Sequence, residues 1–356
     1  MRKSKRAYFA VDLFCGGGGL TQGLKEAGFE VVAGVELDPI AATTYQANHP
    51  TAKLFAKDIR QISGADLLAT SPVGRIDMIA ACPPCQGFSS LTSKYKREDT
   101  RNGLIFEFVR LVKETLPSTI MMENVPGLAN GRGKVFFEKA INDFKKLGYI
   151  VDFKVCDVAD YGVPQHRRRL VLLGALNREI HVATALYGND GTLSPRKTVR
   201  DTLEGLSEPK VFNLKTAKGG ALIERWNVVR KISQLNLERL KALPAESDRR
   251  ALPDNLRPIC HKANDSGFIN VYGRMRWDSP SPTITGGCTT LSKGRFGHPE
   301  KNRTISVLEA ALLQTFPKTY IFPTPSIDAT CKIIGNALPP KFAKIMALQC
   351  LTALQG

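Results

Sequence analysis

Apolar runs and amphipathic stretches alternate along the first half of the chain. Runs of strand length, bounded by turn residues, occur at 8–14, 29–35, 76–81, 118–122, 150–155 and 170–174. Stretches with apolar residues on one helical face occur at 20–27, 104–116 and 136–147, and Gly28 stands where a glycine commonly ends a helix. Repeated strand–helix units of this kind predict a mostly parallel sheet with helices on both faces, the doubly wound α/β class.

The pattern changes near residue 180. Residues 181–300 are rich in Gly, Pro, Ser, Thr, Lys and Arg, and regular periodicity fades. Further helices are predicted at 223–243, 306–316 and 340–351. We therefore expect a large domain formed by residues 1–180 and 326–356, and a smaller irregular domain formed by residues 181–325.

The charge and the cysteines narrow the class of protein. The 356 residues carry a formal net charge of +17, which suggests a polyanionic partner, above all a nucleic acid; a generally basic surface is the alternative. The eight cysteines are scattered, several of them in apolar stretches, which favours reduced thiols in a cytosol. No hydrophobic signal region follows the basic first residues and no apolar run could span a bilayer, so we expect a cytoplasmic protein without membrane contact.

A cysteine follows the apolar run 76–81. Residues 83–89 read Pro-Pro-Cys-Gln-Gly-Phe-Ser, so two prolines stiffen the exit from the strand and Cys85 stands at the tip. Ligands of open α/β sheets bind outside the carboxyl ends of the strands, where a thiol can react rather than pack. Cys82 and Cys85 form a C-x-x-C pair, but the sequence has no second such pair and no H-x-x-x-H motif, so we expect no metal.

Glycines 16–19 separate the first strand from the first helix, where they let a ligand approach the backbone closely. No register supplies the third glycine of G-x-G-x-x-G, so the run does not predict a pyrophosphate site. Glu36 ends the next strand, about where an acidic residue binds ribose hydroxyls. The two features suit a nucleoside cofactor without phosphates, such as S-adenosylmethionine; a glycine-rich turn with a solvated glutamate is the alternative. Asp58 could accept a hydrogen bond from an adenine amino group, or cap a helix.

Two further groups of polar residues stand at strand ends. Glu123 follows the run 118–122, so its carboxylate should face the same crevice as Cys85, where a partly buried carboxyl group can give a proton to a ring nitrogen. Arg167 and Arg169 precede the next strand but one and share a side if strand alternation extends to them. Two guanidinium groups could then bind a carbonyl oxygen and phosphates. A helix cap for the glutamate and a solvated surface for the arginines are the alternatives.

Together these motifs resemble the cytosine-5 DNA methyltransferase family, of the bacterial restriction-modification type. The matching segments stand in the family's order and at its usual spacings; they are 12–19, 35–38, 83–89, 123–125, 165–169 and 335–339. The resemblance implies a Rossmann-like, S-adenosylmethionine-dependent catalytic domain in the larger part of the chain and a target-recognition domain in the smaller. One motif departs from the family: Leu308 replaces an arginine that usually precedes the glutamate, and Thr315 stands where glycine is common.

The resemblance implies a reaction on a cytosine that is rotated out of the DNA duplex. The thiolate of Cys85 would attack C6 of the ring, and Glu123 would hold and protonate N3. Arg167 and Arg169 would grip the cytosine carbonyl and the adjoining backbone, and C5 would take a methyl group from S-adenosylmethionine. The residues that would bind this cofactor are Phe14, Gly16, Gly18, Gly19, Leu20, Glu36, Leu37, Asp58, Ile59, Pro83, Asn336 and Ala337.

Double-stranded DNA is the partner that the resemblance implies, in the cytoplasm and at the nucleoid of a bacterium. Arginine can read guanine and threonine often binds phosphate. The candidate DNA contacts are Gln86, Ser89, Arg274, Arg276, Thr283 and Thr285. A monomer is expected, with a cognate restriction endonuclease that acts separately on the same site. Two other functions stay open: a tRNA cytosine methyltransferase on the same scaffold, and a non-catalytic nucleic-acid-binding regulator, which should have lost Cys85, Glu123 or the cofactor glycines.

Overall fold

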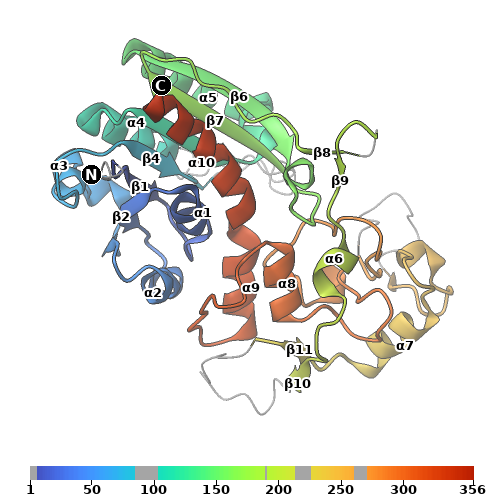
Figure 1. Cartoon of the computed structure of the whole chain (residues 1–356). Helices are drawn as coiled ribbons and strands as arrows, with labels where there is room; N and C mark the ends of the chain where they lie inside the picture. The colour runs from blue at the N-terminus through green and yellow to red at the C-terminus, as the bar shows by residue number, and fades with distance from the viewer. Residues whose placement is uncertain (1–5, 85–102, 189–190, 213–225, 260–270) are drawn as a thin grey trace, which may run out of the picture. The chain divides into compact units, whose positions relative to one another are not determined.

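The computed structural model describes residues 6–84, 103–188, 191–212, 226–259 and 271–356 (Figure 1). These residues form two compact units. Unit 1 comprises the described residues of 1–161, 168–185 and 338–356, and unit 2 comprises those of 162–167 and 186–337. None of the described helices is long and apolar enough to cross a membrane.

Unit 1 is built on a seven-stranded sheet with the strand order β3-β2-β1-β4-β5-β7-β6. Its strands are β1 (Phe9–Leu13), β2 (Glu30–Val35), β3 (Lys53–Phe55), β4 (Met78–Ala81), β5 (Thr119–Asn124), β6 (Tyr149–Asp157) and β7 (Arg168–Leu176). The first five strands in that order are parallel, and β7 is antiparallel to both of its neighbours. Every residue of β1, β4 and β5 is buried, as strands covered on both faces require. The predicted mostly parallel, doubly wound α/β class is confirmed.

Helices flank this sheet (Figure 1). They are α1 (Gly19–Ala27), α2 (Pro39–Asn48), α3 (Gly64–Leu68), α4 (Leu104–Thr115), α5 (Lys134–Lys146) and α10 (Pro340–Gln355). The apolar pattern does not predict α2 and α3. Both begin with a side-chain cap, since Asp38 accepts hydrogen bonds at the start of α2 and Ser63 forms a capping box with Asp66 at the start of α3. These caps are the signal that could have found the two helices.

Close helix packing completes unit 1. At Gly23 of α1, an added Cβ would lie 2.5 Å from the Cβ of Ala343 in α10, so glycine is what lets these two helices approach. Gly28 ends α1 with a φ of 106°, which confirms the predicted cap. Phe108 of α4 and Phe144 of α5 meet edge to face in the main core, with 5.3 Å between ring centroids.

Unit 2 consists of short elements joined by loops. Its helices and strands are α6 (Val199–Leu203), α7 (Gln234–Ala242), α8 (Val307–Leu313), α9 (Ile327–Asn336), and the parallel pairs β8 (Tyr187–Gly188) with β9 (Ser194–Pro195) and β10 (Lys210–Phe212) with β11 (Val228–Arg230). The helix predicted over 223–243 is wrong in its first described part, because Val228–Arg230 pairs with β10 and Ser233 caps a helix that begins at Gln234. Gly335 and Asn336, which begin the last segment that matches the family, end α9.

The boundaries of unit 2 differ from the predicted ones. Residues 162–167 and 326–337 belong to unit 2, whereas the sequence pattern placed them with the larger domain. Long-range hydrogen bonds explain the difference. Nε2 of Gln165 donates to Oε1 of Gln314 at 2.8 Å, and Nε2 of Gln314 donates to the carbonyl oxygen of Ile334. The loop before β7 and the helix α9 are thereby tied into unit 2.

Glu309 has a cationic partner, although Leu308 replaces the arginine that usually precedes this glutamate in the family. Both Nη atoms of Arg303 lie 2.9 Å from the carboxylate oxygens of Glu309, which is 1% exposed. The same glutamate forms a capping box with Ser306 at the start of α8. The buried carboxylate is therefore compensated by an arginine from elsewhere in the loop.

Candidate active site

The carboxyl ends of β1, β2, β4 and β5 meet at one edge of the sheet. Leu13 pairs with both Val35 and Ala81, and Ala81 pairs with Met122. Because β7 is antiparallel to β5, it begins at this edge. The groups that gather there are the glycine turn after β1, Glu36, Cys82, Glu123 and Arg169. In sheets of this kind such an edge is where ligands bind.

The turn after β1 contains three residues with left-handed backbone conformation. Their φ angles are 59° at Phe14, 54° at Gly16 and 91° at Gly18. Phe14 is not glycine, and this conformation costs a bulky residue on the order of 1–2 kcal/mol. Gly18 is the N-cap of α1 and has no side chain to cap the helix, although the N–H of Thr21 in the first turn is bonded to the carboxylate of Asp12. Strained backbone at a strand–helix turn is typical of a ligand-binding turn.

Glu36 closes this turn from the end of β2. Its Oε2 accepts a hydrogen bond from the N–H of Gly16 at 2.8 Å, and its Oε1 accepts one from the N–H of Asp38 at 2.7 Å. Burial raises the pKa of Glu36 above its ordinary value, and the hydrogen bonds oppose that rise. The residue predicted to bind ribose is thus held against the glycine turn by backbone groups.

A buried polar cluster that the sequence analysis missed lies beside the turn. Oγ1 of Thr21 donates to Oδ2 of Asp12 at 2.6 Å and lies 3.2 Å from the hydroxyl of Tyr45. Nε2 of His49 lies 3.2 Å from the carbonyl oxygen of Gly18. Burial raises the pKa of Asp12 to about 7. An aspartate within the apolar run of β1 is the signal that could have found this cluster.

Asp58 caps a short turn, which is the alternative that the sequence left open. Its Oδ1 and Oδ2 accept hydrogen bonds from Nε and Nη2 of Arg60 at 3.0 and 2.6 Å, and it is the N-cap of the 3-10 turn Ile59–Gln61. The Arg60 side chain holds the pKa of this carboxyl group below its usual value. An adenine amino group would have to share the carboxylate with Arg60.

The other predicted cofactor residues divide between the two units. Leu37 is 65% exposed beside Glu36, whereas Leu20 and Ile59 are buried. Asn336 and Ala337 stand at the end of α9 and belong to unit 2.

Glu123 and Arg169 form an ion pair at the edge of the sheet. Nε of Arg169 lies 2.6 Å from Oε1 of Glu123, and the two side chains are 15% and 11% exposed. The neighbouring Asn124, to which the sequence analysis gave no role, donates from Nδ2 to the carbonyl oxygen of Pro83 at 3.0 Å. This bond ties the end of β5 to the segment that leads to Cys85.

Cys85, Gln86 and Ser89 lie outside the described residues, whereas Cys82 is described. Burial and the carboxylate of Glu123 raise the pKa of the Cys82 thiol well above its ordinary value. Cys82 therefore stays protonated at neutral pH, which is unfavourable for a nucleophile. Within the described part of the chain, no group of three His, Cys, Asp or Glu residues could hold a metal ion.

Comparison with known proteins identifies the family. A family profile described as C-5 cytosine-specific DNA methylase matches residues 8–352. The chain belongs to this family. The methylase is 37% identical over 354 residues to the Type II methylase M.HgiDII of Herpetosiphon aurantiacus, covering 97% of this chain and 96% of that protein. It is 34% identical over 341 residues to the Type II methyltransferase M1.HphI of Haemophilus parahaemolyticus, covering 95% and 85%.

A solved structure is similar over the whole chain. It is the crystal structure of a provisionally assigned DNA modification methyltransferase encoded within an E. coli prophage, with a TM-score of 0.74 and 25% identity. The match covers 98% of the methylase and 100% of that chain. The predicted family and enzyme class, a DNA (cytosine-5) methyltransferase, are confirmed by these similarities.

Arg167 of the methylase, predicted to grip the base and backbone beside Arg169, is bonded to main-chain groups of the protein. Its Nη1 and Nη2 donate to the carbonyl oxygens of Ile284 and Gly335, both at 2.9 Å within unit 2. The residue is 3% exposed. Its guanidinium group holds loops of unit 2 together, and Arg169 rather than Arg167 pairs with Glu123.

Arg274, predicted to contact DNA, is a structural residue of unit 2. It is buried, and its Nη atoms donate to four protein acceptors at 2.5–2.9 Å. Those acceptors are the carbonyl oxygens of Leu240, His298 and Lys301 and Oδ1 of Asn302. A guanidinium group engaged in this way has its donors turned to the protein, which argues against base reading by Arg274, so its DNA contact stays only a prediction.

The other predicted DNA contacts in unit 2 are accessible. Arg276 and Thr285 are exposed. Thr283 is half-buried, and its hydroxyl donates to the carbonyl oxygen of His166 at 2.7 Å. Arg276 therefore remains a candidate DNA contact. The Thr283 hydroxyl already donates its proton within the protein, so toward DNA it can chiefly accept a hydrogen bond.

Proposed function

We propose that the methylase transfers a methyl group from S-adenosylmethionine to C5 of a cytosine rotated out of the DNA duplex, through a covalent bond between Cys85 and C6. The observation that carries the proposal is the ion pair of Glu123 and Arg169 at the carboxyl edge of the sheet, beside the strand that leads to Cys85. Family membership supplies the substrate class and the position of methylation. Rotating a base out of the stack costs a few kcal/mol, which contacts to the DNA must offset.

In this proposal the Cys85 thiolate forms a bond to C6 while a proton passes from Glu123 to N3. The electron pair displaced from the C5–C6 double bond forms a C4–C5 double bond while the C4–N3 pair takes up the proton, so C5 becomes nucleophilic. Methylation of C5 restores the C4–N3 double bond. The proton on C5 then passes to water, the C5–C6 double bond forms again, Cys85 leaves as thiolate, and the N3 proton returns to Glu123. Arg169 holds the carboxyl group in place at Oε1 and puts a positive charge near the base carbonyl. Acid catalysis of this kind contributes about 10²–10⁴-fold.

The residues around the glycine turn fit S-adenosylmethionine. When bound, this cofactor supplies an electrophilic methyl group. Gly16 and Gly18 keep the turn free of side chains, and Glu36, held by backbone N–H groups, would bind the ribose hydroxyls. Leu37 offers an exposed apolar side chain for the adenine, and Phe14 offers a half-buried one.

We assign target recognition in double-stranded DNA to residues 181–325, with Arg276, Thr285, Gln86 and Ser89 as candidate contacts. Catalysis and cofactor binding are assigned to residues 1–180 and 326–356, which in this proposal include residues 162–167 and 326–337 of unit 2. The Type II names of both relatives support a modification enzyme that protects DNA from a separate restriction endonuclease. Attack on one flipped base is asymmetric, so the enzyme would act as a monomer.

Bisulfite sequencing of plasmid DNA from a methylation-free bacterial host that expresses the methylase tests the proposal. We expect protected cytosines in one fixed short context. Cys85→Ala should give no protection but still bind DNA with that context, and Cys350→Ala, which alters a buried cysteine of α10, should protect like the wild type.

Protection by Cys85→Ala would overturn the assigned nucleophile. A wild-type protein that binds S-adenosylmethionine but protects no cytosine would overturn the DNA substrate. The tRNA alternative would then be tested with purified tRNA and labelled cofactor.

A further inference from the structure

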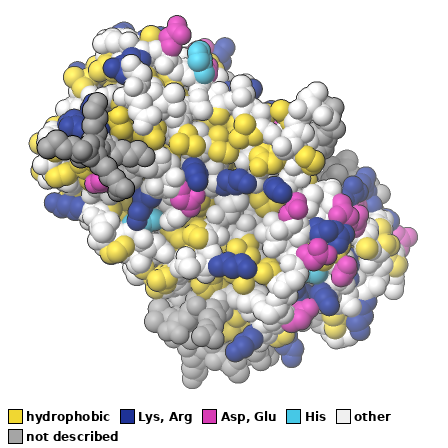
Figure 2. Space-filling model, in the orientation of Figure 1, with side chains coloured by type: hydrophobic (Ala, Val, Ile, Leu, Met, Phe, Trp, Pro, Cys, Tyr) yellow, Lys and Arg dark blue, Asp and Glu magenta, His cyan; other side chains and the backbone are white. Residues whose placement is uncertain are grey.

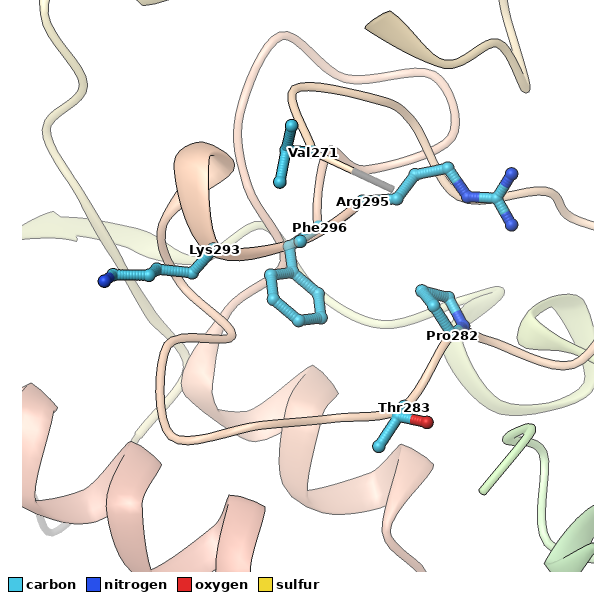
Figure 3. Close-up of a pocket in the computed structure, with 7 residues that line it drawn as sticks. Val271, Pro282, Thr283, Lys293, Arg295 and Phe296 are labelled. Carbon is cyan, nitrogen blue, oxygen red and sulfur yellow. The ribbon is translucent and has the colours of Figure 1, made fainter. Parts of the chain in front are cut away.

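Unit 2 contains a pocket of about 190 Å³ (Figure 3). Its lining side chains are Val271, Pro282, Thr283, Lys293, Arg295 and Phe296. The Phe296 ring lies centrally, and Lys293 and Arg295 extend from it in opposite directions in Figure 3. The pocket is therefore an apolar seat with a cation on each side. Pockets that enclose whole small ligands measure ~300–1,000 Å³, so this one suits only a part of a molecule.

Two glycines make room for the two cations. An added Cβ at Gly287 would lie 2.7 Å from Cβ of Lys293, and an added Cβ at Gly273 would lie 2.8 Å from Cγ of Arg295. The stems of both side chains thus lie directly on backbone that carries no side chain of its own. This packing restricts the directions in which the two charges can point. Lysines and arginines on an open surface ordinarily have no such restriction.

Among the residues that the structure describes, the carboxylate of Asp248 offsets the charge of Arg295 only in part. The side chain is half-buried, and its Nε has no hydrogen-bond partner among them. The nearby carboxylate of Asp248 is bonded to Arg250, with 2.7 Å between Oδ2 and Nη2. Arg276 adds a second positive charge, and burial together with this neighbour lowers the pKa of Arg295. A half-buried cation beside a like charge is stabilised by an incoming anion.

We propose that this pocket seats one sugar of the DNA backbone, with Lys293 and Arg295 bound to phosphates of the same strand on either side of it. The phosphates of a strand continue in both directions from each sugar, and the two cations extend in opposite directions from the apolar seat. Phe296, Val271 and Pro282 offer carbon surface to the C–H groups of the sugar. The contact carries no sequence information and holds the strand in register for target recognition. The proposal rests on the proposed DNA methyltransferase function.

The salt dependence of DNA binding tests the pocket. The logarithm of the binding constant falls linearly with the logarithm of the salt concentration. Each phosphate contact removed from a complex with B-DNA makes this slope shallower by about 0.9. We expect Lys293→Gln and Arg295→Gln each to lower the slope by about 1, and the double variant by about 2. The probe is a duplex that carries the context found by bisulfite sequencing. The same losses are expected with a scrambled duplex, because phosphate contacts do not read bases.

Lys146→Gln is the matched control, because Lys146 is 78% exposed at the end of α5 in unit 1 and the change removes the same charge. Its slope should equal that of the wild type. Equal slopes for Lys293→Gln and Lys146→Gln would overturn the proposal. Lys293 is exposed, so this variant decides the matter even if Arg295→Gln does not fold.

The two proposals fail in different ways. A wild-type enzyme that methylates DNA, with variants that keep the full salt slope, would overturn the pocket alone. A folded wild-type protein that neither binds nor methylates duplex DNA would overturn the proposed function instead.

Discussion

The described arginines that are buried, Arg167, Arg249 and Arg274, all belong to unit 2, whereas Arg169 of unit 1 is partly exposed. In unit 1, Arg169 faces the carboxylate of Glu123 at 2.6 Å. In unit 2, Arg167 donates to two main-chain carbonyl groups and Arg274 donates to three. The backbone explains the difference. The sheet of unit 1 satisfies its own carbonyl groups by strand pairing, whereas the loops of unit 2 leave carbonyl groups that a guanidinium with five donors can bond.

The difference changes how the net charge of +17 is understood. A buried arginine counts in that sum but is not available to DNA. On the face shown in Figure 2, Lys and Arg side chains are scattered among Asp and Glu side chains. Arg274 and Arg276 are two residues apart, yet the first is buried and the second exposed. DNA contacts must therefore be identified site by site, from burial and bonding.

The largest expected effect belongs to the ion pair of unit 1. Glu123→Gln keeps the shape of the side chain but removes the proton for N3, so turnover should fall by about 10²–10⁴-fold. Transfer of a labelled methyl group to plasmid DNA measures it, with the thermal unfolding temperature as a control that should hardly move. Turnover close to that of the wild type would mean that the pair of Glu123 and Arg169 has a structural role, as Arg167 and Arg274 have in unit 2.

A pH effect should follow from Asp12, the carboxyl group that unit 1 buries. Burial raises its pKa from 3.8 to about 7. The native state then binds the proton more tightly than the unfolded chain does. This contribution to stability is complete below pH 3.8 and is lost as the pH rises through about 7. The loss is on the order of 4 kcal/mol.

Urea unfolding between about pH 4 and 8 measures that contribution. Asp12→Asn should remove this decline in the free energy of unfolding, because the amide does not titrate. Unit 2 offers a contrast, since burial lowers the pKa of His298 from 6.5 to about 4, which makes the free energy of unfolding rise with pH between those values in both proteins. An unchanged pH slope in Asp12→Asn would mean that other groups of the chain cause it.

A matched pair of variants tests the roles of arginine in unit 2. Arg274→Gln leaves buried carbonyl groups without donors and should lower the free energy of unfolding by about 3 kcal/mol. Arg276→Gln, at an exposed position, should change it by less than about 0.5 kcal/mol but weaken DNA binding. Thermal unfolding and DNA titration of both variants separate the two roles. The reverse pattern would contradict the contrast between buried and exposed arginines.

The smallest effect is expected at Leu308, where the chain departs from its family. Glu309 already has a bidentate partner in Arg303. Leu308→Arg, which restores the family's residue, should therefore change the free energy of unfolding by less than about 0.5 kcal/mol. Thermal unfolding measures it. A stabilisation well above that size would show that Arg303 does not compensate the glutamate fully.

The sequence by itself determined the sheet and the place of its chemistry. β4 is a continuous apolar run, β1 is apolar except for Asp12, and β5 passes from an apolar run to Glu123 and Asn124 at its end. Parallel strands bring their carboxyl ends to one edge, so residues distant in the chain could be placed together from local pattern alone. The glycine cap at Gly28 was predictable for the same reason, since its signal lies within the helix that it ends.

Only the tertiary structure decided which polar groups are available for chemistry. Arg167 and Arg169 are identical residues two positions apart, but their partners come from distant segments: Ile284 and Gly335 for the first, Glu123 for the second. The same holds for Arg274, whose acceptors lie on separate loops. Bonds between side chains and distant carbonyl groups leave no periodic trace in a sequence. Unit 2, which depends on such bonds more than on regular elements, could therefore be located from the sequence but not built from it.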